Sequence, residues 1–408
     1  MKWLLITAYF PPEIGSASFL FYELGKKLVE RGHKVTVITG YPSYNVDMRK
    51  LPLKYKKGIC LKENIDGMKV VRLKTLRLPR YIPIARGIDQ FLTAFIFFIG
   101  GLFLKKQSFD RVAVYSPPLP LGLAALAISR IKKVQFVLNV QDLFPQSAID
   151  LGILQNRFLI HAFERLETFI YKKADFVTVH SEGNRQHVLS KAVNPAQVLT
   201  IPNWIDTDLV RPGDRNNDFR KEFALGDSFI ISFAGVIGYS QDLDVVIESA
   251  SFIKEEDIVF LIVGDGVEKE RLQNKVRMKN LKNVIFLPMQ PKDKYVELLA
   301  ASDACLVTLH ESVKTPVVPS KLLSIMAAAR PVIASLPLEG DAPKIIEESG
   351  CGICVKAGAS KELADAVKSI HSNRQLGQQY GERGRRYAED NFSLKKCVSL
   401  YETLLPEN

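Results

Sequence analysis

One stretch of the sequence, Thr315 to Ser335 (TPVVPSKLLSIMAAARPVIAS), combines residues that suit an anion. Ser320 and Lys321 follow Pro319 and begin a run of small and apolar residues that is typical of a helix. The first turn of a helix has free backbone N–H groups and the positive end of the helix dipole, so it favours a phosphate. We therefore expect Pro319, Ser320 and Lys321 to form a phosphate site, joined by Lys314. The alternative is that both lysines are solvated surface charges.

Carboxylates that could act on a hydroxyl group lie elsewhere in the chain. Asp142 follows the apolar run QFVLNV, so we expect it at the carboxyl end of a buried strand, in an acid–base or orienting role or as a helix N-cap. Glu13, in PPEIG, is a second candidate to contact or deprotonate such a hydroxyl. Gly15 and Ser16 follow, and a residue without Cβ lets backbone N–H groups approach a diphosphate, or simply shapes a turn. His180 faces the same cleft or is a hydrogen-bonded core histidine.

The elements that must position these residues alternate along the chain. The first half begins with KWLLITAYF, FLFYELGKKLVERG and HKVTVITGYP, a strand, a helix and a strand, and continues with the apolar runs RVAVYS, QFVLNVQD and FVTVHS. After the segment TIPNWIDTDLVRP, a second series starts at FIISFAGVIG. Two such series predict an α/β protein with two doubly wound, Rossmann-like parallel sheets facing across a cleft, in which ligands bind at the carboxyl ends of the strands.

The composition is that of a globular protein with two domains. The chain has 408 residues, of which 47% are hydrophobic and 24% are charged. Five cysteines do not suit a disulfide framework, and the start MKWLLITAYF runs into a turn instead of a cleavage site, so a reducing cytoplasm is expected. Cys351 and Cys354 form a C-x-x-C motif without a second pair or a nearby histidine, and we interpret them as small buried residues of a strand. Asp265 is interpreted as a helix cap.

The positive charge of the chain is confined to its first half. Residues 1–195 hold 29 Lys and Arg against 14 Asp and Glu, whereas the remainder holds 26 against 30. The basic segment 49–86 leads into the apolar run 91–106, whose roughly 14 apolar residues are fewer than the ~20 that span a bilayer. Two interpretations remain: a buried core helix, or an apolar element that dips into a membrane with anionic lipids. Nucleic acid is disfavoured, because aromatic residues are not interleaved with the basic ones.

The order of several motifs resembles glycosyltransferase family 4 of the GT-B architecture over nearly the whole chain. These motifs are PPEIGSAS, ERGHKVTVITG, NVQDLFP, HSEGNR, IPNWIDTDLVRP, FAGVIGYSQDLDVVIESA, LIVGDG and PSKLLSIMAAARPVIAS. GYSQDLD and PSK look most like the branch that builds bacterial surface polysaccharides of the O-antigen, capsule and colanic-acid type. The resemblance implies an acceptor domain at 1–200, a nucleotide-sugar domain at 201–385 and a C-terminal helix, 386–408, that crosses back to the first domain. It also places Asp206–Asp208 in the linker, so this D-x-D motif is interpreted as structural.

Two pairs of charged ligands that this family usually carries are missing here. Its two glutamates, separated by seven residues, fall on Pro316 and Ser324, and its Arg/Lys pair falls on Val236 and Gln241. The leaving diphosphate still needs a positive partner, and no metal-binding cluster is visible, so Lys321 and the helix terminus are expected to neutralise it. Ser324 is expected to replace a ribose-binding carboxylate with one weaker hydrogen bond.

The resemblance also assigns neighbouring loops to the donor. Gly238, Tyr239 and Gln241 of GYSQ lie in the loop after the first strand of the second domain. Gln290 of LPMQ ends a strand at the place where the family holds the nucleotide base, largely by backbone contacts.

The implied activity is that of a retaining, metal-independent glycosyltransferase that needs no cofactor and acts at the cytoplasmic face of the cell membrane. The donor would be a nucleotide-diphospho sugar, expected to be UDP-linked, and the acceptor a polyprenyl-diphosphate-linked glycan served by Asp142 and Glu13. Two alternatives are a sugar-nucleotide epimerase with the same double Rossmann-like plan and a non-catalytic sugar-binding subunit.

Overall fold

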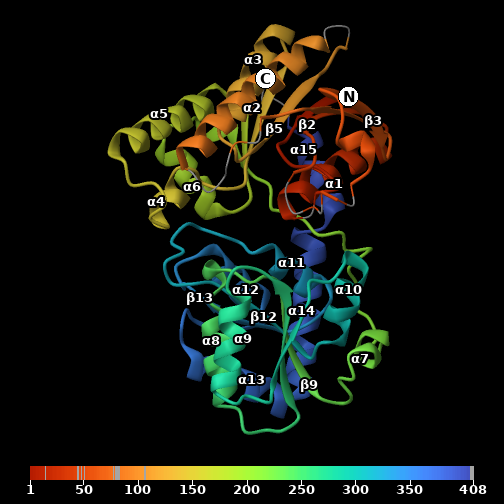
Figure 1. Ribbon diagram of the computed structural model, residues 1–408, viewed down its shortest axis with the longest axis vertical. Helices are drawn as coiled ribbons and strands as arrows, with labels where there is room; N and C mark the ends of the chain where they lie inside the picture. Colours follow the sequence, from red (N-terminus) through yellow and green to blue (C-terminus); the bar gives the residue numbers. More distant parts are fainter. Residues whose placement is uncertain are drawn as a thin grey trace. The chain divides into compact units, whose positions relative to one another are not determined.

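The computed structural model describes residues 1–13, 15–43, 46, 48–49, 51–76, 78, 83–104 and 107–404 (Figure 1). The chain forms two compact units. Unit 1 is Met1–Asn203 together with the C-terminal segment from Cys397, and unit 2 is Trp204–Lys396. The expected C-terminal segment 386–408 needs correction, because residues 386–396 belong to unit 2.

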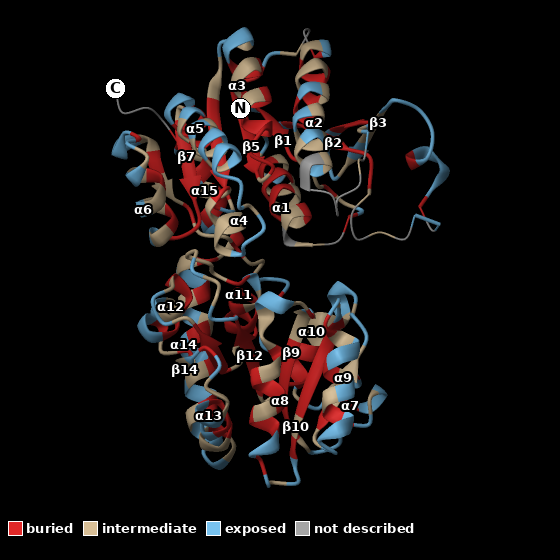
Figure 2. Ribbon diagram, turned by 60° about the vertical axis from the view of Figure 1, so that its left-hand side comes forward, coloured by how far each residue is buried: buried red, intermediate tan, exposed pale blue. Residues whose placement is uncertain are grey.

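Unit 1 is built on an eight-stranded sheet in the described part of the chain. The strand order is β3-β4-β2-β1-β5-β6-β7-β8, and every neighbouring pair is parallel except β3 and β4. The strands are β1 (Lys2–Ile6), β2 (Lys34–Gly40), β3 (Cys60–Ile65), β4 (Met68–Leu73), β5 (Arg111–Ser116), β6 (Gln135–Val140), β7 (Phe176–Val179) and β8 (Val198–Thr200). Strand β5 is buried along its whole length, as expected for a parallel strand covered on both faces (Figure 2).

The helices of unit 1 connect these parallel strands. They are α1 (Ser16–Glu30), α2 (Pro83–Phe103), α3 (Leu121–Lys132), α4 (Gln146–Asp150), α5 (Arg157–Lys173) and α6 (Glu182–Ser190), with the short 3-10 helices η1 (Leu53–Tyr55) and η2 (Pro195–Gln197). Parallel strands require such crossovers, because the chain must return to the same edge of the sheet before each strand.

Helix α2 contains the apolar run singled out in the sequence. Its stretch Ala85–Phe103, 19 residues, is long and apolar enough to cross a membrane by length and composition, and 28% of that stretch is buried. Ala94 and Phe97 pack in the core with strand residues, whereas Phe95 and Phe103 are 60% and 85% exposed. The two interpretations of the run therefore apply to different faces of one helix: one face belongs to the core and the other is apolar and exposed.

The last helix, α15 (Leu394–Glu402), ends against the sheet of unit 1. The guanidinium of Arg111 is fully buried, and its Nη1 donates to the Tyr401 carbonyl at 2.8 Å while its Nη2 donates to the Leu404 carbonyl. The Tyr401 hydroxyl accepts from Asn139 Nδ2 at 2.7 Å. The last carbonyl groups of a helix have no N–H donors from a following turn. Arg111 supplies hydrogen-bond donors to these groups instead.

Unit 2 is built on a six-stranded, wholly parallel sheet in the order β11-β10-β9-β12-β13-β14. The strands are β9 (Phe229–Val236), β10 (Ile258–Asp265), β11 (Val284–Leu287), β12 (Ala304–Thr308), β13 (Val332–Leu336) and β14 (Gly352–Lys356). This is a doubly wound order, in which successive strands are added on one side of β9 up to β11 and then, from β12 on, on its other side.

Helices cover both faces of the second sheet. They are α7 (Asp218–Glu222), α8 (Leu243–Ser251), α9 (Lys269–Met278), α10 (Lys292–Ala301), α11 (Ser320–Ala327), α12 (Asp341–Ser349), α13 (Ser360–Ser372) and α14 (Arg374–Asn391), with the 3-10 helix η3 (Tyr239–Gln241). One core cluster joins α8, α9 and α13 to the strands, and another joins α11, α12 and α14 to them. Helix α14 is part of this second cluster, which is why residues 386–391 stay with unit 2.

Replacing Arg111 with Met is expected to destabilise unit 1 by roughly 3 kcal/mol, because buried carbonyl groups lose their charged donor. The measurement is the thermal unfolding midpoint followed by circular dichroism. The control is Arg165→Met, an exposed arginine of the same unit, which should leave the midpoint nearly unchanged. Equal midpoints for the two variants would show that the helix end is held by other contacts.

Candidate functional site

The strand order of each unit indicates where a ligand binds. In doubly wound sheets, ligands occupy the crevice at the carboxyl ends of the strands where the strand order reverses. That point lies between β9 and β12 in unit 2 and between β1 and β5 in unit 1. The sequence-predicted residues divide between these two places.

Lys321 occupies the reversal point of unit 2. It lies in the first turn of α11, and its Nζ is 3.7 Å from the centre of the Phe233 ring of β9. The same Nζ donates a hydrogen bond to Gln241 Oε1. Three elements, α11, β9 and η3, therefore place one amine at the carboxyl edge of the sheet.

Lys321 as a whole is partly exposed, but neighbouring protein crowds its amine, which lies over an aromatic ring. Burial lowers the pKa of Lys321 from its ordinary 10.5 to about 7, and no charged neighbour contributes to that shift. A desolvated amine without a carboxylate partner favours its neutral form. An anionic ligand would supply the missing charge, so this residue marks a place for an anion.

Gly235, near the end of β9, lies close to the amine. Gly235 has a φ of 147°, which a residue with a Cβ rarely adopts, and a Cβ there would lie 3.7 Å from Lys321 Nζ. Gly238, the predicted ligand, has an ordinary φ of −132°, so its conformation does not require glycine. Val236 and Tyr239 are 60% and 75% exposed. Gly235 is thus a site residue that the sequence analysis missed, and the signal was its place one residue before the end of an apolar strand.

The position of Gln241 is fixed by the end of β12. Its carbonyl oxygen accepts a hydrogen bond from Thr308 Oγ1, and the His310 backbone N–H donates to the Ser240 carbonyl at 3.0 Å. Asp242 follows, with a φ of 45°, and burial raises the pKa of its carboxyl while the nearby His310 ring lowers it. Asp242 and His310 were not predicted, although each follows the end of a strand closely.

The other predicted donor residues differ in exposure. Ser320 is exposed at the start of α11, where Pro319 provides no side-chain cap, so backbone N–H groups of the first turn are open to a ligand. Lys314 is exposed, and Gln290 is partly exposed, with its Nε2 donating to the Pro288 carbonyl. Ser324 is 8% exposed, and its hydroxyl donates to the Ser320 carbonyl. That hydroxyl is therefore buried and bonded to its own helix, and the ribose role of Ser324 stays a prediction.

Unit 1 has a hollow of about 630 Å³ at the carboxyl edge of its sheet. It is lined from the strand side by Ala8, Tyr9, Gly40, Tyr41, Thr75 and Pro118, and from α2 by Arg86, Asp89, Gln90, Thr93 and Phe97. The lining combines a cation, hydroxyl groups and aromatic surface, so it suits a ligand with both polar and apolar parts.

Asp142 lies two residues after the end of β6, and its carboxyl interacts with the charge of Arg86, which lines this hollow. The residue is open to solvent, yet neighbouring protein crowds its carboxyl, and this burial raises its pKa. Hydrogen bonds from Ser147 and the Leu143 backbone and the charge of Arg86 act in the opposite direction. The N-cap position of α4 is Pro145, so the alternative of a helix cap at Asp142 does not describe its place. A carboxyl near a hollow and a cation can accept a proton from a hydroxyl group.

Glu13 has a different role from the one predicted. It is 2% exposed, its Oε2 accepts from the Phe10 N–H at 3.1 Å, and its Oε1 accepts from the Ser43 N–H at 2.8 Å. The carboxylate therefore joins the loops after β1 and β2 and positions them instead of facing a substrate. Gly15 has a φ of 144° with open space where a Cβ would point, as a close backbone approach requires. The side chain of Ser16 lies outside the described part of the structure.

The remaining candidates have structural explanations. His180 is 8% exposed and its Nε2 lies 2.7 Å from Asn184 Nδ2, as in the core interpretation. Asp206 accepts hydrogen bonds from two backbone N–H groups of its own turn. Asp265 accepts from the Gly266 N–H, whereas the N-cap of α9 is Glu268, so the predicted cap is wrong. Among the described residues, no group of three His, Cys, Asp or Glu could hold a metal ion.

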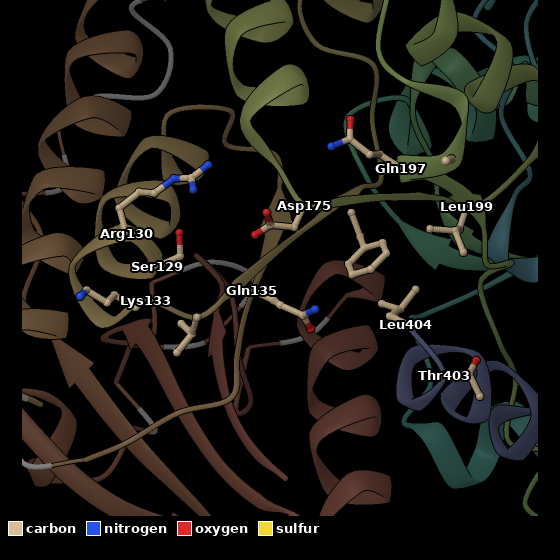
Figure 3. Close-up of a pocket in the computed structure, with 12 residues that line it drawn as sticks. Ser129, Arg130, Lys133, Gln135, Asp175, Gln197, Leu199, Thr403 and Leu404 are labelled. Atoms are coloured by element: carbon tan, nitrogen blue, oxygen red, sulfur yellow. The ribbon is translucent and has the colours of Figure 1, made fainter. Parts of the chain in front are cut away.

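A larger hollow, of about 1040 Å³, lies at the opposite edge of the first sheet (Figure 3). It is lined by the starts of β6 and β7, by the end of α3 and by Thr403 and Leu404. Arg130 and Asp175 come from different sides of this hollow (Figure 3). Because parallel sheets bind their ligands at the carboxyl edge, we do not assign the reaction to this larger space.

Comparison with known families agrees with this geometry. Residues 17–204 match the family model of the glycosyl transferase 4-like domain, and residues 214–387 match that of glycosyl transferases group 1. The chain belongs to these glycosyltransferases. Both matches describe transferases, so neither supports the epimerase or the non-catalytic alternative.

Individual relatives of this glycosyltransferase extend over its whole length. The putative colanic acid biosynthesis glycosyl transferase WcaI of Escherichia coli K12 is 25% identical, over 94% of this chain and 96% of that one. Sucrose-phosphate synthase of Thermosynechococcus elongatus has a TM-score of 0.77 at 17% identity, over 99% and 98% of the two chains. HepE of Anabaena, solved with UDP and glucose, has a TM-score of 0.74 at 15% identity, over 100% of both chains. The predicted GT-B architecture is confirmed.

Replacing Glu13 with Gln tests its assignment as a loop-positioning residue. An amide keeps only one acceptor oxygen, so one of two buried N–H groups would face an NH₂ donor, and we expect a loss of stability of roughly 1–3 kcal/mol. Thermal unfolding measures it, with Glu164→Gln on the surface of α5 as the matched control. An unchanged midpoint together with lost transferase activity would instead show that Glu13 acts directly in the reaction.

Proposed function

We propose that the protein transfers a sugar, with retention of configuration, from a UDP-sugar to a polyprenyl-diphosphate-linked glycan in surface polysaccharide biosynthesis. The observation that carries the donor part is the Lys321 amine at the reversal point of unit 2, which has no carboxylate partner in the described part of the chain. The relative named for colanic acid biosynthesis supports the pathway class, and the UDP complex of HepE supports the donor class.

In the proposed reaction, the bond between the sugar C1 and the β-phosphate oxygen breaks, and its electron pair stays on the leaving diphosphate. Lys321 and the N-terminus of α11 then stabilise the charge that develops on that group. The acceptor oxygen forms the new bond to C1, and its proton passes to the carboxylate of Asp142. No metal enters the scheme, because the charge is balanced by the amine and by backbone N–H groups.

We further propose that unit 1 binds the acceptor from the inner membrane surface. The exposed face of α2 carries Ile88, Phe91, Phe95 and Phe103, and the hollow beneath the same helix is lined by Arg86. An apolar helix face of this kind enters the lipid boundary, and Lys and Arg of the basic first half attract anionic headgroups. The diphosphate of the acceptor would meet Arg86, and its sugar hydroxyl would meet Asp142.

Replacing Lys321 with Ala is expected to weaken UDP binding roughly 30- to 100-fold, because a partly buried charge partner of the diphosphate is removed. The measurement is the thermal shift with UDP, GDP, ADP, CMP and NAD, with and without EDTA, since a ligand that binds the folded state raises its stability. Lys356→Ala, an exposed lysine at the end of β14, is the control. A wild-type shift with NAD alone, or loss of the UDP shift in EDTA, would contradict the proposed donor site.

Replacing Phe95 or Phe103 with Glu is expected to weaken binding to anionic vesicles about tenfold, because an apolar contact becomes a repelled charge. Co-sedimentation with phosphatidylcholine vesicles, with and without phosphatidylserine, measures it. Met278→Glu is the control, since Met278 is 81% exposed and lies in unit 2. Wild-type sedimentation of both phenylalanine variants would exclude this face as the membrane contact.

A further inference from the structure

The Lys321 amine is held by groups that cannot balance a positive charge. The Phe233 ring and the Gln241 side-chain oxygen are both neutral, and they are the partners that the amine contacts. Either contact favours an ammonium only weakly compared with a carboxylate. The position of the amine is therefore determined, but its charge is not.

The titratable groups around this amine have other partners. From the turn and α8, Asp242 interacts with His310, and Asp244 is paired with Lys275 at 2.6 Å. From the end of β12, the His310 ring lies 2.9 Å from the Ser312 hydroxyl. Tyr295 of α10 bonds to Ser324 on the inner side of α11, and Glu311 and Lys314 are exposed. None of these groups contributes to the state of Lys321, for which burial is the cause.

We propose that Lys321 receives its charge from donor binding: above neutral pH the amine is mostly neutral in the empty site, and it takes one proton from solvent when the diphosphate enters. The inference rests on the proposed function, because it concerns the same donor site. Gln241 and Phe233 are then positioning residues, which hold Nζ beside Gly235 in either state. When the nucleoside diphosphate leaves, the proton returns to solvent, so the exchange of donor for product is coupled to pH.

The position of Gln241 explains why this arrangement is possible. The family lysine expected at this position would bring a permanent charge next to Lys321, and two ammonium groups would repel each other. Because Gln241 is neutral, the Lys321 amine of α11 reaches the same turn without repulsion. It can then lose its proton between catalytic cycles. The neutral form avoids the cost of a desolvated charge in the empty protein.

The direct test is isothermal titration calorimetry of UDP at pH 8.5 in buffers of different ionisation enthalpy. The diphosphate is fully ionised there, since phosphate groups titrate near pH 6. With the pKa of Lys321 at about 7, we expect close to one proton taken up per UDP, and an affinity that falls about tenfold per pH unit above pH 7. UDP binding without proton uptake would overturn the inference and leave the donor site standing, whereas absence of UDP binding would overturn both.

Two variants identify the titrating group. Lys321→Arg keeps a permanent charge, so proton uptake should fall to near zero while UDP still binds. Lys321→Gln should bind weakly, with an affinity that no longer depends on pH between 7 and 9. Proton uptake that persists in Lys321→Gln would assign it to another group, such as Asp242 or His310, and overturn the inference.

The empty protein provides a measurement that does not involve the donor. A lysine whose folded-state pKa is lowered binds fewer protons in the folded than in the unfolded state between about pH 7 and 10.4, so stability rises with pH in that window. The thermal midpoint of the wild type should therefore rise relative to that of Lys321→Gln between pH 7 and 9.5. Parallel pH profiles would show that the amine is already charged in the empty site.

Discussion

Parallel strand pairing is the constraint on which both units depend. Neighbouring parallel strands need a crossover helix, and each crossover returns the chain to the same edge, so the loops that follow the strands all gather at the carboxyl edge. In unit 2, the order β11-β10-β9-β12-β13-β14 leaves the turn after β9 beside the loop after β12, and both contribute to the place where Lys321 lies. In unit 1, the same constraint brings the loops after β1, β2, β4 and β5 to one hollow under α2.

In unit 2, the cation at the turn after β9 comes from a different element than the one on which basic residues were expected. Val236 and Gln241 stand where basic residues were expected, and the cation at this turn comes from α11 instead. Its chemistry differs accordingly, because an amine over the ring of Phe233 is desolvated, and desolvation favours the neutral form. The local dielectric and the absence of a carboxylate partner decide its charge, not the residue type.

Local signals in the sequence predicted the fold: strand and helix alternation gave two doubly wound sheets, which the structure contains. The Pro-Ser-Lys helix start singled out Lys321, whose phosphate role stays a prediction. Contacts between distant residues were not predictable: Glu13 bonds to a backbone group thirty positions away, and the Ser324 hydroxyl is turned into its own helix. Helix α2 belongs to both categories, since its apolar character is evident in the sequence but the division between its buried and exposed faces is not.

By itself, the sequence determined the fold class, the family and the elements that carry the chemistry, because hydrophobic periodicity, glycine placement and motif order depend on neighbours along the chain. Only the tertiary structure decided which polar groups meet. It joined Gln241 to Lys321, used Glu13 to hold two loops, placed Asp142 near Arg86 and kept α14 in unit 2. The physical reason is that burial and hydrogen-bond partners, which determine the charge and the role of a side chain, come from segments that are far apart in the chain.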